Sequence, residues 1–186
     1  MSGEWEIAAN VLNAASVLLA GRNSVHTWWT GIVASVLFGV VFYAAKLYAD
    51  VALQLFFFLA GAAGWWAWLR GGGGRELPVG RGTARASAWM LASGLAAAAA
   101  CGWVLRRFTD AYAPFFDSLV LAFSILGQLL LVRRRYESWW CWLLVNTVAV
   151  PLYAARGLYV TAALYLAFGV NTIVALVYWR RLLRAA

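Results

Sequence analysis

The sequence predicts an all-α integral membrane protein with seven transmembrane helices, and two features of the chain lead to that fold class. Of its 186 residues, 65% are hydrophobic and only 12% are charged, whereas soluble domains carry roughly 25% charged residues. The apolar residues also fall in long blocks instead of alternating stripes. A helix that spans a bilayer needs about 20 predominantly apolar residues, and seven blocks approach or reach that length.

The first block is the weakest of the seven, because Asn10, Asn13 and Ser16 interrupt it. It does not read as a cleaved signal peptide, since acidic Glu4 and Glu6 stand where a basic segment belongs. In chain order, the expected spans are 6–20, 28–45, 51–69, 86–105, 115–132, 139–155 and 159–182.

The basic residues predict how the spans are oriented. With seven spans, the loops after spans one, three and five share one side with the C-terminus, and that side holds eleven of the fifteen Lys and Arg residues. The opposite side holds four, namely Lys46, Arg106, Arg107 and Arg156. Because Lys and Arg accumulate on the cytoplasmic side, we expect the N-terminus outside and the C-terminus in the cytoplasm. The net charge of +8 is therefore a topology signal, and we expect no nucleic-acid partner.

An internal repeat organises the chain. Sliding the sequence by 111 positions aligns residues 18–58 with residues 129–169 and gives identical residues at 12 of 41 positions. The matches include the doublet Trp28-Trp29 with Trp139-Trp140, which apolar composition alone would rarely produce. The first three spans therefore correspond to the last three.

The fourth span, as a connector, makes the two repeats parallel. Parallel three-helix repeats are a known transporter plan, seen in the SWEET sugar carriers, with the substrate near the midplane between the halves. We expect a first bundle over 1–70, a Gly-rich cytoplasmic loop over 71–85, a linker helix over 86–107 and a second bundle over 108–186.

The sharpest candidate site lies in the sixth span. Trp139, Trp142 and Asn146 are spaced i, i+3 and i+7 and so form one stripe on a helix. Two indoles above an amide suit a planar, polar or cationic ring, which they would stack on and hydrogen-bond. Pro151, which cannot donate to the carbonyl of Thr147, predicts a kink or break just past the stripe. The alternative is that the Trp residues are interfacial anchors and Asn146 bonds a neighbouring helix.

Two further deep amides, Gln54 and Gln128, are candidate ligands, with packing polarity as the rival explanation. No Lys or Arg sits at the centre of a span, which argues against a phosphorylated substrate. His26 is the only histidine, and the spans hold no central carboxylate and no Gly-rich nucleotide loop. We therefore expect no metal, no cofactor and no enzymatic activity.

At these residues the sequence resembles the PnuC-type nicotinamide riboside transporters, the NMN transporter family, along nearly the whole chain. The resemblance rests on KLYADVALQLFFFLAGAAGWWAWLR, GQLLLVRRRYESWWCWLLVN and LYAARGLYVTAALYLAF. It implies a SWEET-like fold, and it implies that Trp-x-x-Trp-x-x-x-Asn, here Trp139, Trp142 and Asn146, is the substrate-binding signature. It also implies facilitated diffusion of a vitamin-type nucleoside for NAD biosynthesis, in the cell (inner) membrane, by a possible homotrimer embedded in membrane lipid.

The substrate itself stays open among several vitamins. The family includes carriers for thiamine, riboflavin and deoxynucleosides, and nicotinamide riboside and thiamine both present a cationic aromatic ring. The sequence departs from the family pattern at Asn171, where a small residue is expected. A membrane enzyme or assembly factor is the remote alternative.

Overall fold

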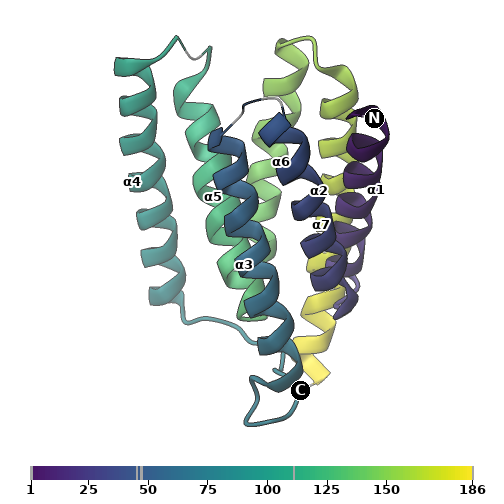
Figure 1. The fold of residues 1–186 in the computed structure, drawn as a ribbon. Helices are drawn as coiled ribbons and strands as arrows, with labels where there is room; N and C mark the ends of the chain where they lie inside the picture. Colours follow the sequence, from purple (N-terminus) through teal and green to yellow (C-terminus); the bar gives the residue numbers. More distant parts are fainter. Residues whose placement is uncertain (1, 45, 47, 111, 186) are drawn as a thin grey trace. The chain divides into compact units, whose positions relative to one another are not determined.

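The computed structural model describes residues 2–44, 46, 48–110 and 112–185, which form seven α-helices (Figure 1). This confirms the predicted all-α fold and the number of helices. Their bounds are α1 (Ser2–Gly21), α2 (His26–Ala44), α3 (Tyr48–Arg70), α4 (Ala84–Phe108), α5 (Pro114–Val132), α6 (Ser138–Ala155) and α7 (Tyr159–Ala185).

Five of these helices, namely α2, α3, α4, α5 and α7, are long and apolar enough to cross a membrane. The two remaining helices are α1, which contains Asn10 and Asn13, and α6, which contains Asn146 and Pro151. Helix α6 continues through Pro151 to Ala155, so it is not interrupted beyond the Trp and Asn stripe.

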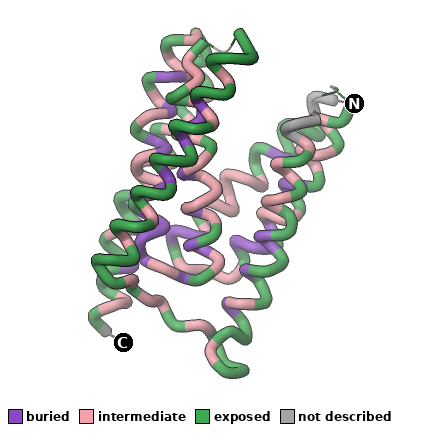
Figure 2. The backbone as a smooth tube through the Cα atoms, turned by 90° about the vertical axis from the view of Figure 1, so that its left-hand side faces the viewer, coloured by how far each residue is buried: buried purple, intermediate pink, exposed green. Residues whose placement is uncertain are grey.

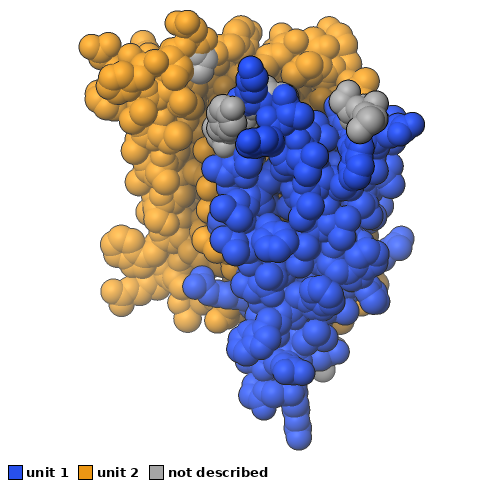
Figure 3. Space-filling view, in the orientation of Figure 1, with its two compact units in different colours: residues 1–78, 132–134, 186 blue, residues 79–131, 135–185 orange. Residues whose placement is uncertain are grey.

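The chain divides into two compact units (Figure 3). Unit 1 consists of residues 1–78 with residues 132–134 and contains α1, α2 and α3. Unit 2 consists of residues 79–131 with residues 135–185 and contains α4 to α7. Residues 132–134, where α5 ends and the turn to α6 begins, belong to unit 1, whereas the residues before and after them belong to unit 2.

Large hydrophobic side chains are exposed along most helices, as a bilayer-embedded surface requires. Buried positions lie in short stretches between exposed ones (Figure 2). Exposed examples include Val40 in α2, Leu95 in α4 and Val174 in α7. In water such a surface would drive association, but lipid tails are as apolar as these side chains.

In unit 1, α2 packs on α1 and on α3 through small residues and one indole. Ser16 and Thr27 bond reciprocally, since each hydroxyl donates to the other residue's carbonyl oxygen, at 2.8 and 2.9 Å. The ring of Trp28 covers Gly64 on α3, where a β-carbon would lie only 2.4 Å from the ring. The same ring meets Trp68 edge to face, with centroids 5.2 Å apart.

Arg134 belongs to unit 1 and is buried, whereas its neighbour Arg133 is exposed. Its guanidinium lies 4.5 Å from the centroid of the Trp68 ring, donates to Asn23 Oδ1 at 2.9 Å and also donates to the carbonyl of Leu77. Glu76 stands 3.7 Å away. Burial lowers the pKa of Arg134, and the charge of Glu76 opposes that shift. Arg134 thereby joins the ends of three loops in this unit.

In unit 2, α6 and α7 form the counterpart of the α2–α3 pair. Trp139 meets Trp179 edge to face, with centroids 5.4 Å apart and an interplanar angle of 71°. On the other helices of this unit, the ring of Phe123 lies against Gly94 of α4. Arg156, just after α6, forms an ion pair of 2.6 Å with Asp117 in the first turn of α5.

The 111-residue repeat recurs in the backbone of the turns. Asn23 and Arg134, which are 111 positions apart, both have positive φ, at 55° and 51°, and so do Lys46 and Gly157, at 60° and 76°. The turn bond from Ser24 N to the carbonyl of Leu19 has its equivalent in the bond from Arg135 N to the carbonyl of Leu130. The offset also pairs Trp68 with Trp179, so the repeat extends beyond the aligned segment.

We predict opposite stability effects for two glycine substitutions in unit 1. Gly64→Ala forces a β-carbon into the buried Trp28 ring, and overpacking of this kind costs about 1–3 kcal/mol. Gly39→Ala is the matched control, because a β-carbon there meets only Gln54 Cβ at 4.0 Å. That variant should gain up to about 1 kcal/mol of helix propensity. Thermal unfolding in detergent measures both, and equal midpoints would contradict the packing described for Trp28.

Candidate functional site

The residues of the predicted stripe on α6 contact two different helices: Trp139 and Asn146 contact α7, and Trp142 contacts α5. Trp139 is only 2% exposed and packs against Trp179 of α7. Its indole Nε1 has no hydrogen-bond partner among the described residues. Trp139 therefore fixes how α6 lies against α7, and its edge-to-face partner occupies part of the ring surface that a ligand would stack on.

Trp142 is half-buried and lies against α5. A β-carbon on Gly127 would stand 3.3 Å from Cε2 and Nε1 of this indole, so a side chain at position 127 would press on the ring. Trp142 also packs on the buried cluster of unit 2, which consists of Phe123, Leu130, Cys141 and Val145. Cys141 and Cys101 are free thiols, as expected of packing residues.

Asn146 is the most constrained polar group of the stripe. It is 4% exposed, and its Nδ2 donates to Thr172 Oγ1 on α7 at 3.1 Å. The Thr172 hydroxyl in turn donates to the carbonyl of Phe168, one turn earlier, at 2.8 Å. A β-carbon at Gly169 would lie 3.6 Å from Asn146 Cβ, an ordinary van der Waals distance, so α6 and α7 lie close together at this point. The interhelical bond, which the sequence left as an alternative, is thus present.

The two predicted glutamines lie in different units. Gln128 is partly buried on α5, next to the glycine that carries the Trp142 ring. Gln54 is partly buried on α3 of unit 1, near Gly39 of α2. Within unit 2 the structure joins Asn146 of α6 to Thr172 of α7 and places Trp142 against Gly127, the neighbour of Gln128.

Thr172 was missed by the reasoning from sequence. Hydroxyls inside a helix usually bond back to the carbonyl four residues earlier, so the residue drew no attention beside the amides. The available signal was position: Thr172 directly follows Asn171, which the family pattern singled out.

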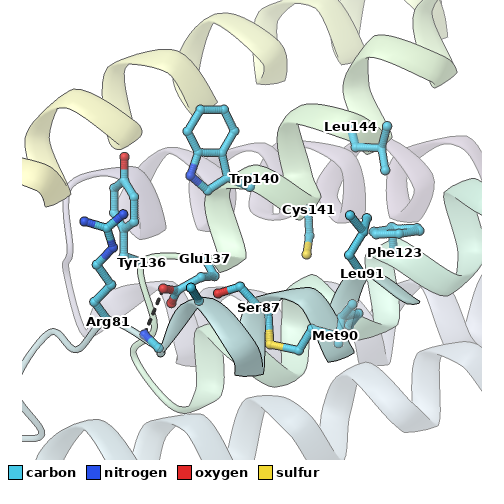
Figure 4. Close-up of a pocket in the computed structure, with 13 residues that line it drawn as sticks. Arg81, Ser87, Met90, Leu91, Phe123, Tyr136, Glu137, Trp140, Cys141 and Leu144 are labelled. Atoms are coloured by element: carbon cyan, nitrogen blue, oxygen red, sulfur yellow. Dashed lines mark hydrogen bonds between the residues drawn. The ribbon is translucent and has the colours of Figure 1, made fainter. Parts of the chain in front are cut away.

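A cavity of about 670 Å³ lies elsewhere in unit 2, between α4, α5 and the start of α6 (Figure 4). Glu137 lines it and accepts a hydrogen bond from the Gly82 amide at 2.8 Å through Oε1. None of the five predicted site residues lines this cavity. Trp140 and Glu137 both line it, and an indole with a carboxylate in the same cavity makes it a rival location for a cationic ring. The other lining residues include Arg81, Ser87, Met90, Phe123 and Leu144.

The part of the chain that the structure describes holds no group of His, Cys, Asp and Glu side chains that could bind a metal ion. The chemistry available at the α6 stripe is therefore recognition: aromatic stacking by Trp142 and hydrogen bonding by the Asn146 amide.

Comparison with known proteins places the chain in a family. The model of the nicotinamide mononucleotide transporters matches residues 4–181. The chain belongs to this family. It is therefore a membrane transporter, and with its apolar helices it is a multi-pass protein of the inner membrane.

Relatives in the family carry different substrates in their names. The nicotinamide riboside transporter PnuC of Escherichia coli (strain K12) is 25% identical over 187 residues, which cover 87% of this chain and 78% of that protein. The riboflavin/roseoflavin transporter RibM of Streptomyces davaonensis is 29% identical over 181 residues, with 94% and 81% covered.

A solved structure supports the fold. The crystal structure of the vitamin B3 transporter PnuC superposes with a TM-score of 0.73 at 20% identity and covers 96% of this chain and 81% of that one. At this identity the likeness establishes that both chains share the fold.

Proposed function

We propose that this transporter facilitates the diffusion of nicotinamide riboside, the vitamin B3 nucleoside, across the cytoplasmic membrane. The observation that carries the proposal is the pair on α6 formed by half-buried Trp142 and, one turn on, buried Asn146. A cationic pyridinium ring that bears a carboxamide needs an aromatic face and an amide partner, and this pair offers both. The similarity to the E. coli nicotinamide riboside transporter supports the same substrate.

Each residue of the proposed site has its own role. Trp142 stacks on the pyridinium ring, and Asn146 hydrogen-bonds a polar group of the ligand. Trp139 holds α6 against α7 and lines the site beside Trp142. Gln54 and Gln128 supply further amides for the ribose hydroxyls. We propose no role for a cofactor or a coupling ion.

Riboflavin is the second candidate, because RibM is more identical to this chain than the E. coli protein is. Its ring is larger and uncharged, so stacking on Trp142 would lack the cation–π component. Thiamine also has a cationic ring and is a further candidate, because cation–π stacking on Trp142 would hold it in the same way. Calorimetric titration of the purified protein with each vitamin decides between them, and tighter binding of riboflavin than of nicotinamide riboside would contradict the first proposal.

We further propose that the N-terminus lies outside the cell and the C-terminus in the cytoplasm, from the distribution of Lys and Arg. A homotrimer is part of the proposal and rests on the family resemblance alone. The 3+1+3 arrangement of bundle, linker helix and bundle is proposed on the same resemblance together with the internal repeat.

The orientation predicts the activity of reporter fusions. A reporter that is active only in the cytoplasm should be active when fused after Ala186 and silent when inserted beside Lys46, because eleven basic residues favour the first side and four the second. Western blots against the fusions control for expression. The reverse pattern of activity would show that the charge count misassigns the two sides.

The mechanism predicts uptake without ion coupling. Proteoliposomes should equilibrate nicotinamide riboside down its gradient at rates that do not change with imposed proton or sodium gradients, because no acidic residue stands at the centre of a span. Liposomes without protein provide the background rate. Accumulation above the external concentration, driven by either ion, would overturn facilitated diffusion.

The site predicts the effect of two truncations on binding. Trp142→Ala removes aromatic stacking on the ring, which is worth about 1–3 kcal/mol. The affinity for nicotinamide riboside should therefore fall about fivefold to over a hundredfold, because 1.4 kcal/mol is tenfold. Asn146→Ala removes a hydrogen bond worth about 0.5–1.5 kcal/mol net, so the same affinity should fall about twofold to tenfold. Gln54→Ala should act in the same direction. Calorimetric titration of monodisperse variants measures each affinity.

Two control variants separate this site from its rival. Arg133→Ala changes an exposed basic residue of the α5–α6 turn and should leave the affinity as in the parent. Glu137→Gln removes the negative charge of Glu137 from the cavity between α4, α5 and α6 but keeps an oxygen that can accept from the Gly82 amide. Loss of binding in Glu137→Gln, with parental affinity in both Trp142→Ala and Asn146→Ala, would move the substrate site to that cavity.

A further inference from the structure

The orientation of the Asn146 amide is set by a chain of two hydrogen bonds. The Thr172 hydroxyl donates to the carbonyl of Phe168, and Asn146 Nδ2 donates to the same hydroxyl oxygen. A threonine hydroxyl carries one proton. Since that proton goes to Phe168, Oγ1 can only accept from Asn146.

This arrangement disfavours the flipped amide. Turning the Asn146 side chain over would place its carbonyl oxygen against the Thr172 oxygen, and the hydroxyl proton would have to leave the carbonyl of Phe168 to bridge the two oxygens. Both residues are buried, at 4% and 1% exposed, so water cannot rescue the contact. A buried polar group without a partner is expensive, and Nδ2 therefore stays on the side of α7.

The carbonyl oxygen Oδ1 of Asn146 consequently points away from Thr172. In the part of the chain that the structure describes, no group donates a hydrogen bond to it. Asn146 thus offers a ligand the acceptor Oδ1 together with the one Nδ2 proton that Thr172 does not take.

The repeat shows that this pair is not required for packing two helices. The positions 111 residues earlier hold Ser35 on α2 and Gly61 on α3, and that helix pair also has the edge-to-face indoles. Glycine has no side chain to accept from Ser35. The amide–hydroxyl pair is therefore a feature of the second repeat alone.

We infer that Thr172 is a positioning residue that presents Asn146 Oδ1 as an acceptor, so that the site selects ring ligands bearing an N–H donor, such as a carboxamide, over the corresponding carboxylates. A carboxylate would set its oxygens against Oδ1 with no proton to share. The inference deepens the proposed function, because it rests on Asn146 contacting the transported ligand.

The test compares two nucleosides that differ only at this group. Nicotinamide riboside carries a carboxamide on its pyridinium ring, and nicotinic acid riboside carries a carboxylate at the same position. Calorimetric titration of the parent should show a preference for the amide on the order of 10- to 100-fold. The ratio of the two affinities is the readout, because general loosening of the site would weaken both ligands alike.

Three variants probe Thr172. Thr172→Val keeps the shape but frees the Asn146 amide to turn its donor toward a carboxylate, so the ratio should fall to within about threefold of one. Thr172→Ala should lower the ratio of affinities in the same way, and it replaces the valine variant if that variant is not monodisperse. Thr172→Ser retains the hydroxyl and should keep the parental ratio.

Each remaining outcome overturns a different statement. If Thr172→Val and Thr172→Ala weaken both nucleosides equally and keep their ratio, the hydroxyl is structural and the inference is wrong. A parent that binds both nucleosides with equal affinity also refutes the inference while leaving the transport proposal intact. A parent that binds neither one refutes the proposed substrate itself.

Discussion

The hydrocarbon interior of a bilayer offers no hydrogen-bond partner, and this constraint governs the backbone and many of the polar side chains of the helices. Backbone amides and carbonyls must bond within their own segment, so spans become helices. Several hydroxyls inside the helices meet the same requirement. Thr30, Thr147 and Thr172 each donate to the carbonyl four residues earlier, and Ser16 and Thr27 satisfy one another across α1 and α2. Asn146 instead has its partner on another helix, at Thr172 of α7.

Lipid tails are as apolar as the side chains, so burying an apolar side chain between helices gains no hydrophobic free energy. Close van der Waals contact therefore has to hold the helices together. Glycines at the interfaces provide it: Gly64 accepts the Trp28 ring, Gly94 the Phe123 ring and Gly127 the Trp142 ring. The buried Arg134 shows the same rule for a charge, since its guanidinium is enclosed by an indole face, an amide oxygen, a carbonyl and a carboxylate.

The number and type of the helices could be predicted because span length and apolar composition are local properties. The seven predicted spans overlap the seven helices, and the turns at Asn23 and Arg134, which the repeat aligns, share a positive φ. Contacts between distant positions could not be predicted in this way. Periodicity placed Trp139 on the stripe but could not show that Trp179 covers it, and it gave no reason to examine Thr172. Arg134 looked like any other basic loop residue, because burial by residues outside its own turn leaves no local pattern.

The duplication separates what the fold needs from what the site needs. The Trp28–Trp68 and Trp139–Trp179 pairs occupy equivalent positions in both repeats, so they belong to the helix frame. At a neighbouring contact the larger side chain is on the other helix in each repeat. In the first repeat Gly31 packs against the larger Ser16. In the second repeat the equivalent of Gly31 is Trp142, which packs against Gly127, the equivalent of Ser16.

The second repeat has therefore placed its large aromatic and its amide where the first repeat has glycine and serine, without changing the frame that holds them. Gly127 makes room for part of this indole, because it stands where the first repeat has Ser16. The proposed contacts of Trp142 and Asn146, with Thr172 behind them, all lie in the second repeat, so they can change with the ligand while the indole pairs keep both helix hairpins in place.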